Sequence, residues 1–249
     1  MTGGASFAPP RTSVRGSVPD GSSYGSEASM GMPILYPMMV NLTGKRCLVV
    51  GGGMVAERKV ARLVECNAQV EVVSPAATPR LAALASSRRI RWRRRTVRDS
   101  DLSGAFLVIA ATDDPLVNRD VARQVRSTGG LVNVADDPEA CSFLVPSVVR
   151  RGELTIALST GGGSPALAKK LRQRLEQTIG PEYAKFLRAL RLLRKQAKQA
   201  VHDPKKRQAI YRRAVESNLF EAAARGDAAS VASEIDTLVK LGLPASPRT

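Results

Sequence analysis

The chain has 249 residues, a formal net charge of +16 and a hydrophobic content of 43%, a composition typical of a globular protein. Its three cysteines (Cys47, Cys66 and Cys141) are scattered, and His202 is the single histidine. This excludes a disulfide framework, a zinc site built on paired cysteines and a histidine-rich metal centre. No apolar run reaches the ~20 residues of a membrane-spanning helix, so we expect a cytoplasmic protein without membrane contact.

Residues 1–32 form a predicted disordered extension. They are rich in Gly, Ser and Pro and lack the apolar stretch of a secretory signal. Met30 or Met32 is an alternative start site. Nearly all of the positive charge lies beyond this extension, and a basic domain attracts polyanions. A nucleic acid and a small polycarboxylate both satisfy this charge.

Short apolar runs alternate with helical patterns between residues 33 and 142. We expect helices close to 54–66, 78–87 and 115–128. The expected strands are 47–50, 68–74, 90–97, one within 104–114, and 131–135. This alternation predicts an α/β fold, a Rossmann-like doubly wound parallel sheet with helices on both faces.

The pattern changes after residue 142. Two apolar runs surround residues 150–153 and predict a pair of hairpin strands. Ser164 is a suitable N-cap and Pro165 a suitable first residue for the helix that follows. Residues 181–249 have helical character throughout, with a break near 202–206. We therefore expect three parts, at 33–142, 143–180 and 181–249.

A glycine-rich turn joins the first predicted strand to the first predicted helix. Gly51, Gly53 and Ala56 form a G-x-G-x-x-A pattern at the place where dinucleotide-binding domains hold a pyrophosphate. The acid that usually binds the adenosine ribose after the second strand is missing. Ser74 stands there instead, and Arg80 follows nearby, so these residues leave NAD and NADP both open.

Two adjacent carboxylates, Asp136 and Asp137, follow the fifth predicted strand. A turn, a metal site and a catalytic base are all consistent with such a pair. The carboxyl ends of strands in a doubly wound sheet meet at the ligand crevice, which favours a functional role.

The segment 88–95 holds six arginines around Trp92. A nucleic-acid patch is one interpretation. An edge strand with solvated arginines is the other, since such charges discourage pairing between sheet edges, and we favour this second interpretation.

Three stretches together resemble the precorrin-2 dehydrogenase/sirohydrochlorin ferrochelatase family, the N-terminal module of sirohaem synthase. They are CLVVGGGMVAERKVARL, LVIAATDDPLVN and NVADDPEACSFLVPSVVRRGELTIALSTGGGSPALAKKLRQRLE, and the resemblance covers about residues 34–200. Because the chain ends at Thr249, we expect the stand-alone form without a methyltransferase module.

The resemblance implies NAD-dependent oxidation of precorrin-2, a tetrapyrrole with eight carboxylates, to sirohydrochlorin. Some members of the family also insert ferrous iron to give sirohaem. Members are homodimers, and residues 143–180 are the expected dimerisation segment. A non-catalytic dinucleotide-sensing module remains the alternative, and no nucleic acid or resident metal is expected.

The resemblance also assigns residues. Asp136 is the expected catalytic base, and Asp137 becomes a turn residue. The expected dinucleotide contacts are Gly51, Gly53, Met54, Val55, Ser74, Pro75, Ala76, Thr112 and Asp113. The expected substrate-binding loop, whose backbone N–H groups suit carboxylates, consists of Ser159, Thr160, Gly161, Gly162, Gly163 and Ser164.

Overall fold

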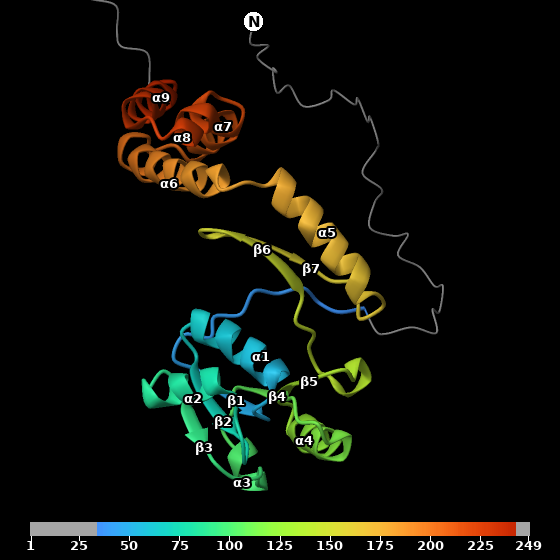
Figure 1. Ribbon diagram of the computed structural model, residues 1–249. Helices are drawn as coiled ribbons and strands as arrows, with labels where there is room; N and C mark the ends of the chain where they lie inside the picture. Colours follow the sequence, from blue (N-terminus) through green and yellow to red (C-terminus); the bar gives the residue numbers. More distant parts are fainter. Residues whose placement is uncertain (1–33, 243–249) are drawn as a thin grey trace, which may run out of the picture. The chain divides into compact units, whose positions relative to one another are not determined.

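The computed structural model describes residues 34–242 (Figure 1). The predicted disordered extension at 1–32 lies outside the described residues. Five parallel strands form one sheet in the order β3-β2-β1-β4-β5, which confirms the predicted doubly wound topology. The strands are β1 Arg46–Val50, β2 Gln69–Val73, β3 Arg91–Arg93, β4 Leu107–Ala110 and β5 Leu131–Val134.

Helices cover both faces of this sheet. The four are α1 Met54–Glu65, α2 Pro79–Ser86, α3 Asp99–Leu102 and α4 Pro115–Ser127. Successive residues of a strand point to opposite faces, so Cys47 and Val49 of β1 pack with α1 and α2, while Leu48 and Val50 pack with α3 and α4. All four are at most 2% exposed, which explains why β1 is an uninterrupted apolar run.

Helix α3 is a short element that the sequence analysis missed. It has only four residues, and the pattern of apolar residues cannot reveal so short a helix. A capping contact stabilises it, because the Asp101 carboxylate accepts a hydrogen bond of 2.9 Å from the backbone N–H of Arg98.

The segment after the sheet contains the predicted hairpin. Strands β6 Ser147–Arg151 and β7 Leu154–Leu158 pair in antiparallel fashion, and helix α5 Pro165–Thr178 follows. Ser164 caps α5 by accepting a hydrogen bond of 3.2 Å from the backbone N–H of Leu167, as the sequence predicted. The Arg151 guanidinium joins the hairpin to α5, because it donates to the carbonyl oxygens of Glu176 (2.9 Å) and Ile179 (2.8 Å).

The C-terminal part is a helical bundle with its own core. Its helices are α6 Glu182–Ala200, α7 Pro204–Val215, α8 Leu219–Arg225 and α9 Ala228–Lys240. Leu193, Leu219 and Ile235 are completely buried in that core. The predicted break at 202–206 is confirmed, since Asp203 caps α7 through the backbone N–H of Lys205. Among residues 34–242, no helix combines the length and apolar character needed to cross a membrane.

Candidate functional site

The glycine turn after β1 packs tightly on two neighbouring strand ends. Gly51 has a φ of 119°, and a Cβ atom there would lie 2.2 Å from the carbonyl oxygen of Ala111. A Cβ atom at Gly52 would lie 1.9 Å from the carbonyl oxygen of Ala76. Both positions therefore require glycine. Sequence reasoning missed Gly52, although three consecutive glycines were a visible signal.

Gly53 differs from its two neighbours because a Cβ atom there would meet nothing within 4 Å. The residue is exposed and forms the N-cap of α1, and no side chain caps this helix. The backbone N–H groups of Met54 and Val55 in the first turn are therefore available to an anion, and the helix dipole adds partial positive charge. Ala56 is completely buried, so α1 packs closely against the sheet.

The residues after β2 form the second wall beside the glycine turn. Ser74 is 9% exposed, and its carbonyl oxygen accepts a hydrogen bond of 3.0 Å from the indole N–H of Trp92. The backbone N–H of Thr78 donates to the carbonyl oxygen of Gly52 at 3.0 Å. Arg80 forms an ion pair of 3.5 Å with Glu57, a buried acid in the first turn of α1.

The turn after β4 holds Thr112 through a buried amide. The Thr112 hydroxyl donates to Asn118 Oδ1 at 2.8 Å, and the Asn118 side-chain amide donates to the carbonyl oxygen of Thr112 at 3.0 Å. Asp114 caps α4, which leaves the exposed Asp113 as the free carboxylate of this turn. Sequence reasoning missed Asn118, the residue that fixes this turn.

Asp136 stands in a tightly held turn directly after β5. It is exposed and has a φ of 61°, a left-handed conformation that is uncommon outside glycine. Ser142 returns alongside β5, and its hydroxyl oxygen accepts a hydrogen bond of 2.8 Å from the backbone N–H of Val132. Asp137 caps the short 3-10 helix η1 Pro138–Ala140 and pairs with Arg119 at 3.2 Å. The two acids therefore differ, since Asp137 is a turn residue and Asp136 is free.

The strand register brings these turns to one edge of the sheet. Val50, Val73, Ala110 and Val134 are the last residues of their strands and lie in one row of hydrogen-bonded neighbours. Adjacent strands are about 4.8 Å apart. The strand order reverses between β1 and β4, the position at which doubly wound folds bind ligands. The glycine turn, the Thr112 turn and Asp136 therefore all lie at the carboxyl-terminal edge of the sheet.

The predicted substrate-binding loop at 159–164 is folded by its own side chains. The Thr160 hydroxyl oxygen accepts a hydrogen bond of 3.1 Å from the backbone N–H of Ser164, and the Ser159 hydroxyl oxygen accepts one from Gly161. Gly161 and Gly162 have φ angles of 61° and 88°. No hydrogen bond or ion pair between described residues joins this loop to the Asp136 turn.

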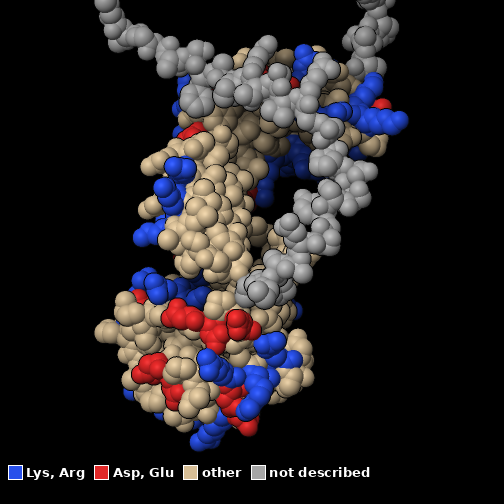
Figure 2. Space-filling view, turned by 90° about the vertical axis from the view of Figure 1, so that its right-hand side faces the viewer, with Lys and Arg blue, Asp and Glu red and all other residues tan. Residues whose placement is uncertain are grey.

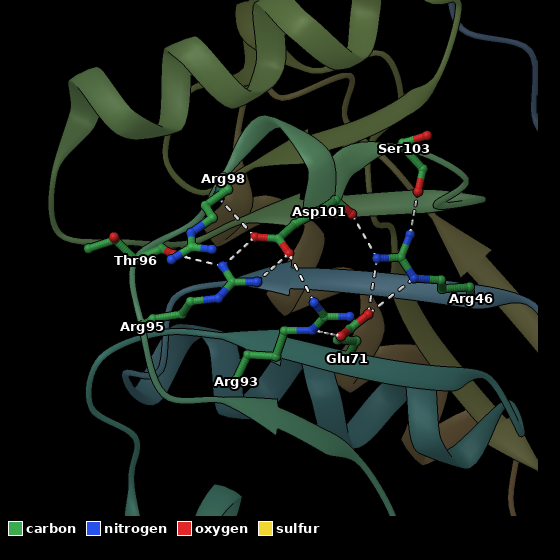
Figure 3. Close-up of polar contacts among 8 residues, drawn as sticks. All are labelled: Arg46, Glu71, Arg93, Arg95, Thr96, Arg98, Asp101 and Ser103. Carbon is green, nitrogen blue, oxygen red and sulfur yellow. Dashed lines mark hydrogen bonds and ion pairs between the residues drawn. The ribbon is translucent and has the colours of Figure 1, made fainter.

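The arginine-rich segment is an edge strand, as predicted, but the prediction that its arginines are solvated is wrong for two of them. Figure 3 shows Arg93 and Arg95 directed toward two acids, Glu71 and Asp101. These acids are 4% and 2% exposed. Arg46 of β1 joins the same cluster, with an Nη2–Oε2 distance of 3.0 Å to Glu71.

This cluster has a clear electrostatic consequence. Hydrogen bonding from the Arg95 guanidinium is the main cause that lowers the pKa of Asp101 to about 2. The guanidinium groups of Arg93 and Arg95 therefore form ion pairs that stabilise the fold. On the face of the α/β part seen in Figure 2, other lysine and arginine side chains are interspersed with acidic ones.

Comparisons with known proteins agree with this architecture. A family model described as NAD(P)-binding matches residues 38–147. A second, for the central part of sirohaem biosynthesis proteins, matches 151–178, and a third, the sirohaem synthase dimerisation region, matches 182–239. The sirohaem synthase of Thioalkalivibrio sulfidiphilus is 38% identical over 208 residues, which is 84% of this chain.

The chain belongs to the sirohaem synthase family.

Two further comparisons define the extent of the likeness. The sirohaem synthase of Methylobacillus flagellatus is 46% identical over 150 residues, 60% of this chain. The chain spans 42% of the Thioalkalivibrio relative and 32% of the Methylobacillus relative. A solved structure titled SirC, precorrin-2 dehydrogenase shares the fold, with a TM-score of 0.70, 24% identity and coverage of 83% of this chain and all of that one.

The family models assign the three parts of this sirohaem synthase family member. The NAD(P)-binding match spans the sheet and both sets of covering helices. The match to the dimerisation region falls on α6 to α9. It follows the hairpin segment 143–180, for which the sequence analysis had predicted the dimerisation role.

Proposed function

We propose that this chain oxidises precorrin-2 to sirohydrochlorin with NAD as the hydride acceptor, a step of sirohaem biosynthesis. One observation carries the proposal. An open glycine turn with an uncapped helix and a free carboxylate, Asp136, lie at the same edge of one parallel sheet. The glycine turn and the helix N-terminus suit a dinucleotide, and the Asp136 carboxylate suits a proton. Dehydrogenation of the substrate requires an acceptor for a hydride and one for a proton.

The residues present fit a nicotinamide dinucleotide. Space is open beside Gly53, and the N–H groups of Met54 and Val55 would hold the pyrophosphate. Residues 74–76 would border the adenosine ribose, and Thr112 with Asp113 the nicotinamide ribose. When bound, NAD supplies a hydride acceptor.

We propose NAD in preference to NADP because of the charge beside the second strand. Arg80 is the cation nearest in sequence that would attract a 2′-phosphate. Its guanidinium is 69% exposed but already pairs with the Glu57 carboxylate at 3.5 Å. A phosphate there would compete with that carboxylate for the same cation, so we expect kcat/KM to be higher with NAD than with NADP.

Asp136 would act as the general base. Conversion of precorrin-2 to sirohydrochlorin removes one hydride and one proton, and the exposed carboxylate would accept the proton. A positioned base of this kind contributes about 10²–10⁴-fold to a rate. The hydrogen bond between Val132 and Ser142 and the cap by Asp137 hold the turn around Asp136, which would keep its carboxylate at this edge of the sheet. The backbone N–H groups of the loop 159–164 would bind substrate carboxylates, and the match to the dimerisation region supports a homodimer.

The test is turnover with matched variants. Purified protein is mixed with fresh precorrin-2 and NAD, and NADH and sirohydrochlorin absorbance are recorded. Asp136→Asn should lower kcat by about 10²-fold or more, the scale of a lost general base. Glu139→Gln, which changes another exposed carboxylate on the same turn, should keep wild-type activity. Full activity of Asp136→Asn would refute the base assignment.

The alternative of a dinucleotide-sensing module predicts a different result. Such a protein binds NAD in calorimetry but shows no turnover of precorrin-2. Ferrochelatase activity stays a separate prediction, tested by offering sirohydrochlorin and ferrous iron or cobalt to the same preparation. Among the described residues, no group of three or more His, Cys, Asp or Glu side chains is arranged to hold a metal ion.

A further inference from the structure

One buried amide of α4 holds the turn after β4 by three hydrogen bonds. Asn118 is 6% exposed. Its Oδ1 accepts from the backbone N–H of Thr112 at 3.0 Å and from the Thr112 hydroxyl at 2.8 Å, and its Nδ2 donates to the Thr112 carbonyl oxygen at 3.0 Å. Because a backbone N–H only donates and a carbonyl only accepts, a side-chain amide can satisfy both groups at once. A single residue of α4 therefore fixes the backbone of the turn that precedes this helix.

The peptide group that Asn118 holds also borders the glycine turn. Strand β4 ends at Ala110, so the peptide bond between Ala111 and Thr112 lies beyond the strand. A Cβ atom at Gly51 would lie 2.2 Å from the carbonyl oxygen of Ala111 and 3.0 Å from the backbone nitrogen of Thr112. The N–H of this peptide group points to Asn118, and the carbonyl oxygen on its opposite side points to Gly51. Asn118 therefore fixes the contact between the Thr112 turn and the glycine turn.

The hydrogen bonds of this turn determine which of its groups remain free for a ligand. The Thr112 hydroxyl donates to Asn118 and accepts a hydrogen bond of 3.2 Å from the backbone N–H of Asp114. The Asp114 carboxylate caps α4. Asp113 lies between them, is exposed, and takes part in no ion pair or side-chain hydrogen bond among the described residues. Its two carboxylate oxygens are acceptors that suit the adjacent hydroxyl groups of a ribose.

We propose that Asn118 is a positioning residue for the dinucleotide: by holding the Thr112 turn against the glycine turn, it presents the Asp113 carboxylate to the ribose that carries the nicotinamide. This inference rests on the proposed function, because it takes NAD to be the ligand of the glycine turn. It adds a residue that touches no ligand itself. It also divides the affinity for NAD into one part that depends on Asn118 and one part that does not.

The supports of the two turns explain this division. The glycine turn is held by contacts that do not involve Asn118, because the Gly51 N–H donates to the carbonyl oxygen of Val73 at 3.0 Å and the Gly52 carbonyl accepts from Thr78 at 3.0 Å. The adenosine and pyrophosphate should therefore still bind when Asn118 is replaced. Within residues 34–242, Asn118 alone satisfies the backbone N–H and carbonyl that follow Ala111. The contact with the second ribose should therefore be lost.

Three ligands of increasing length separate the two parts of the affinity. The dissociation constants of ADP, ADP-ribose and NAD are measured on the full chain by calorimetry, or by ligand-observed NMR where binding is weak. In wild type, ADP-ribose should bind about tenfold more tightly than ADP, the scale of one hydrogen bond to a charged group. Asn118→Leu should keep the affinity for ADP within about twofold but lose this gain. Asp113→Asn should lose the gain as well, and the double variant should lose no more than either single one.

A matched control destabilises the same helix without touching the turn. Val121 of α4 is 2% exposed and packs in the sheet core, so Val121→Ala should lower the melting temperature but keep the gain from ADP to ADP-ribose. If Asn118→Leu does not fold, Thr112→Val carries the test. It removes the hydroxyl and its bond of 2.8 Å to Asn118, so the gain should decrease.

The outcomes distinguish this inference from the proposed function. A gain that survives in Asn118→Leu would overturn the inference, and so would an equal loss of affinity for ADP and ADP-ribose, which indicates a purely structural role. If wild type binds the three ligands as expected but oxidises no precorrin-2, the proposed function fails and the role of Asn118 stands. If wild type binds neither ADP nor NAD, both fail.

Discussion

Replacement of Asp101 by Asn tests the ion cluster shown in Figure 3. The Asp101 carboxylate accepts two hydrogen bonds of 2.7 Å from Arg95 and one of 2.9 Å from the backbone N–H of Arg98. Its side chain is 1% exposed. The variant keeps the shape of the side chain but removes its charge, so the guanidinium groups of Arg93 and Arg95 lose a common partner.

The expected magnitude follows from the pKa of Asp101. A decrease from 3.8 to about 2 corresponds to ~2.5 kcal/mol at 1.36 kcal/mol per unit. The Arg93 and Arg95 side chains are 39% and 27% exposed, so solvent screening reduces this to about 1–2 kcal/mol. The hydrogen bond from the backbone N–H of Arg98 is one of the causes of the lowered pKa, so this figure already includes it. We expect a loss of about 1–2 kcal/mol in the free energy of unfolding at pH 7.

The stability difference between wild type and Asp101→Asn should depend on pH. Because the pKa in the folded state lies below that of the unfolded chain, the stabilisation is complete above the unfolded value and is lost as the pH falls toward 2. Urea unfolding of wild type and Asp101→Asn should therefore give curves that differ at pH 7 and converge below about pH 4. Asp99→Asn, an exposed acid in the same helix, should cost less than about 0.5 kcal/mol. A constant difference between wild type and Asp101→Asn from pH 7 to pH 3 would refute the reasoning.

Two further predictions concern the glycine turn and the buried thiol. Gly52→Ala should weaken NAD binding at least about tenfold in calorimetry and lower stability by about 1–3 kcal/mol, because its Cβ would lie 1.9 Å from the carbonyl oxygen of Ala76. Gly53→Ala should fold normally, since that position is open, and equal stability losses in both variants would contradict this account. Burial is the main cause that raises the pKa of Cys47 to about 11, so iodoacetamide at pH 8 should modify Cys47 only after unfolding, with the half-buried Cys66 as the internal reference in mass spectrometry.

Local patterns in the sequence were enough for the architecture. Apolar runs and turn residues identified β1, β2, β4 and β5, because strands buried on both faces are nearly continuous apolar segments. The arginine-rich β3 was predicted as an edge strand instead. The N-cap Ser164 and the break before α7 followed from the preferences of single residues at helix ends. The glycine turn and Asp136 were predicted as site residues because both stand directly beside a strand end, where a doubly wound sheet collects its ligand contacts.

Only the tertiary structure decided which polar residues meet. The pairing of Lys59 with Asn133 spans 74 positions, and that of Arg46 with Glu71 spans 25. Neither leaves a local pattern, since such contacts depend on strand order and on the face to which a side chain points. The same reason explains Gly52, whose neighbour Ala76 lies in the turn after β2. The sequence by itself therefore determined most of the elements and which candidate residues follow the strand ends, whereas the packing of distant elements determined the partners of the charged groups.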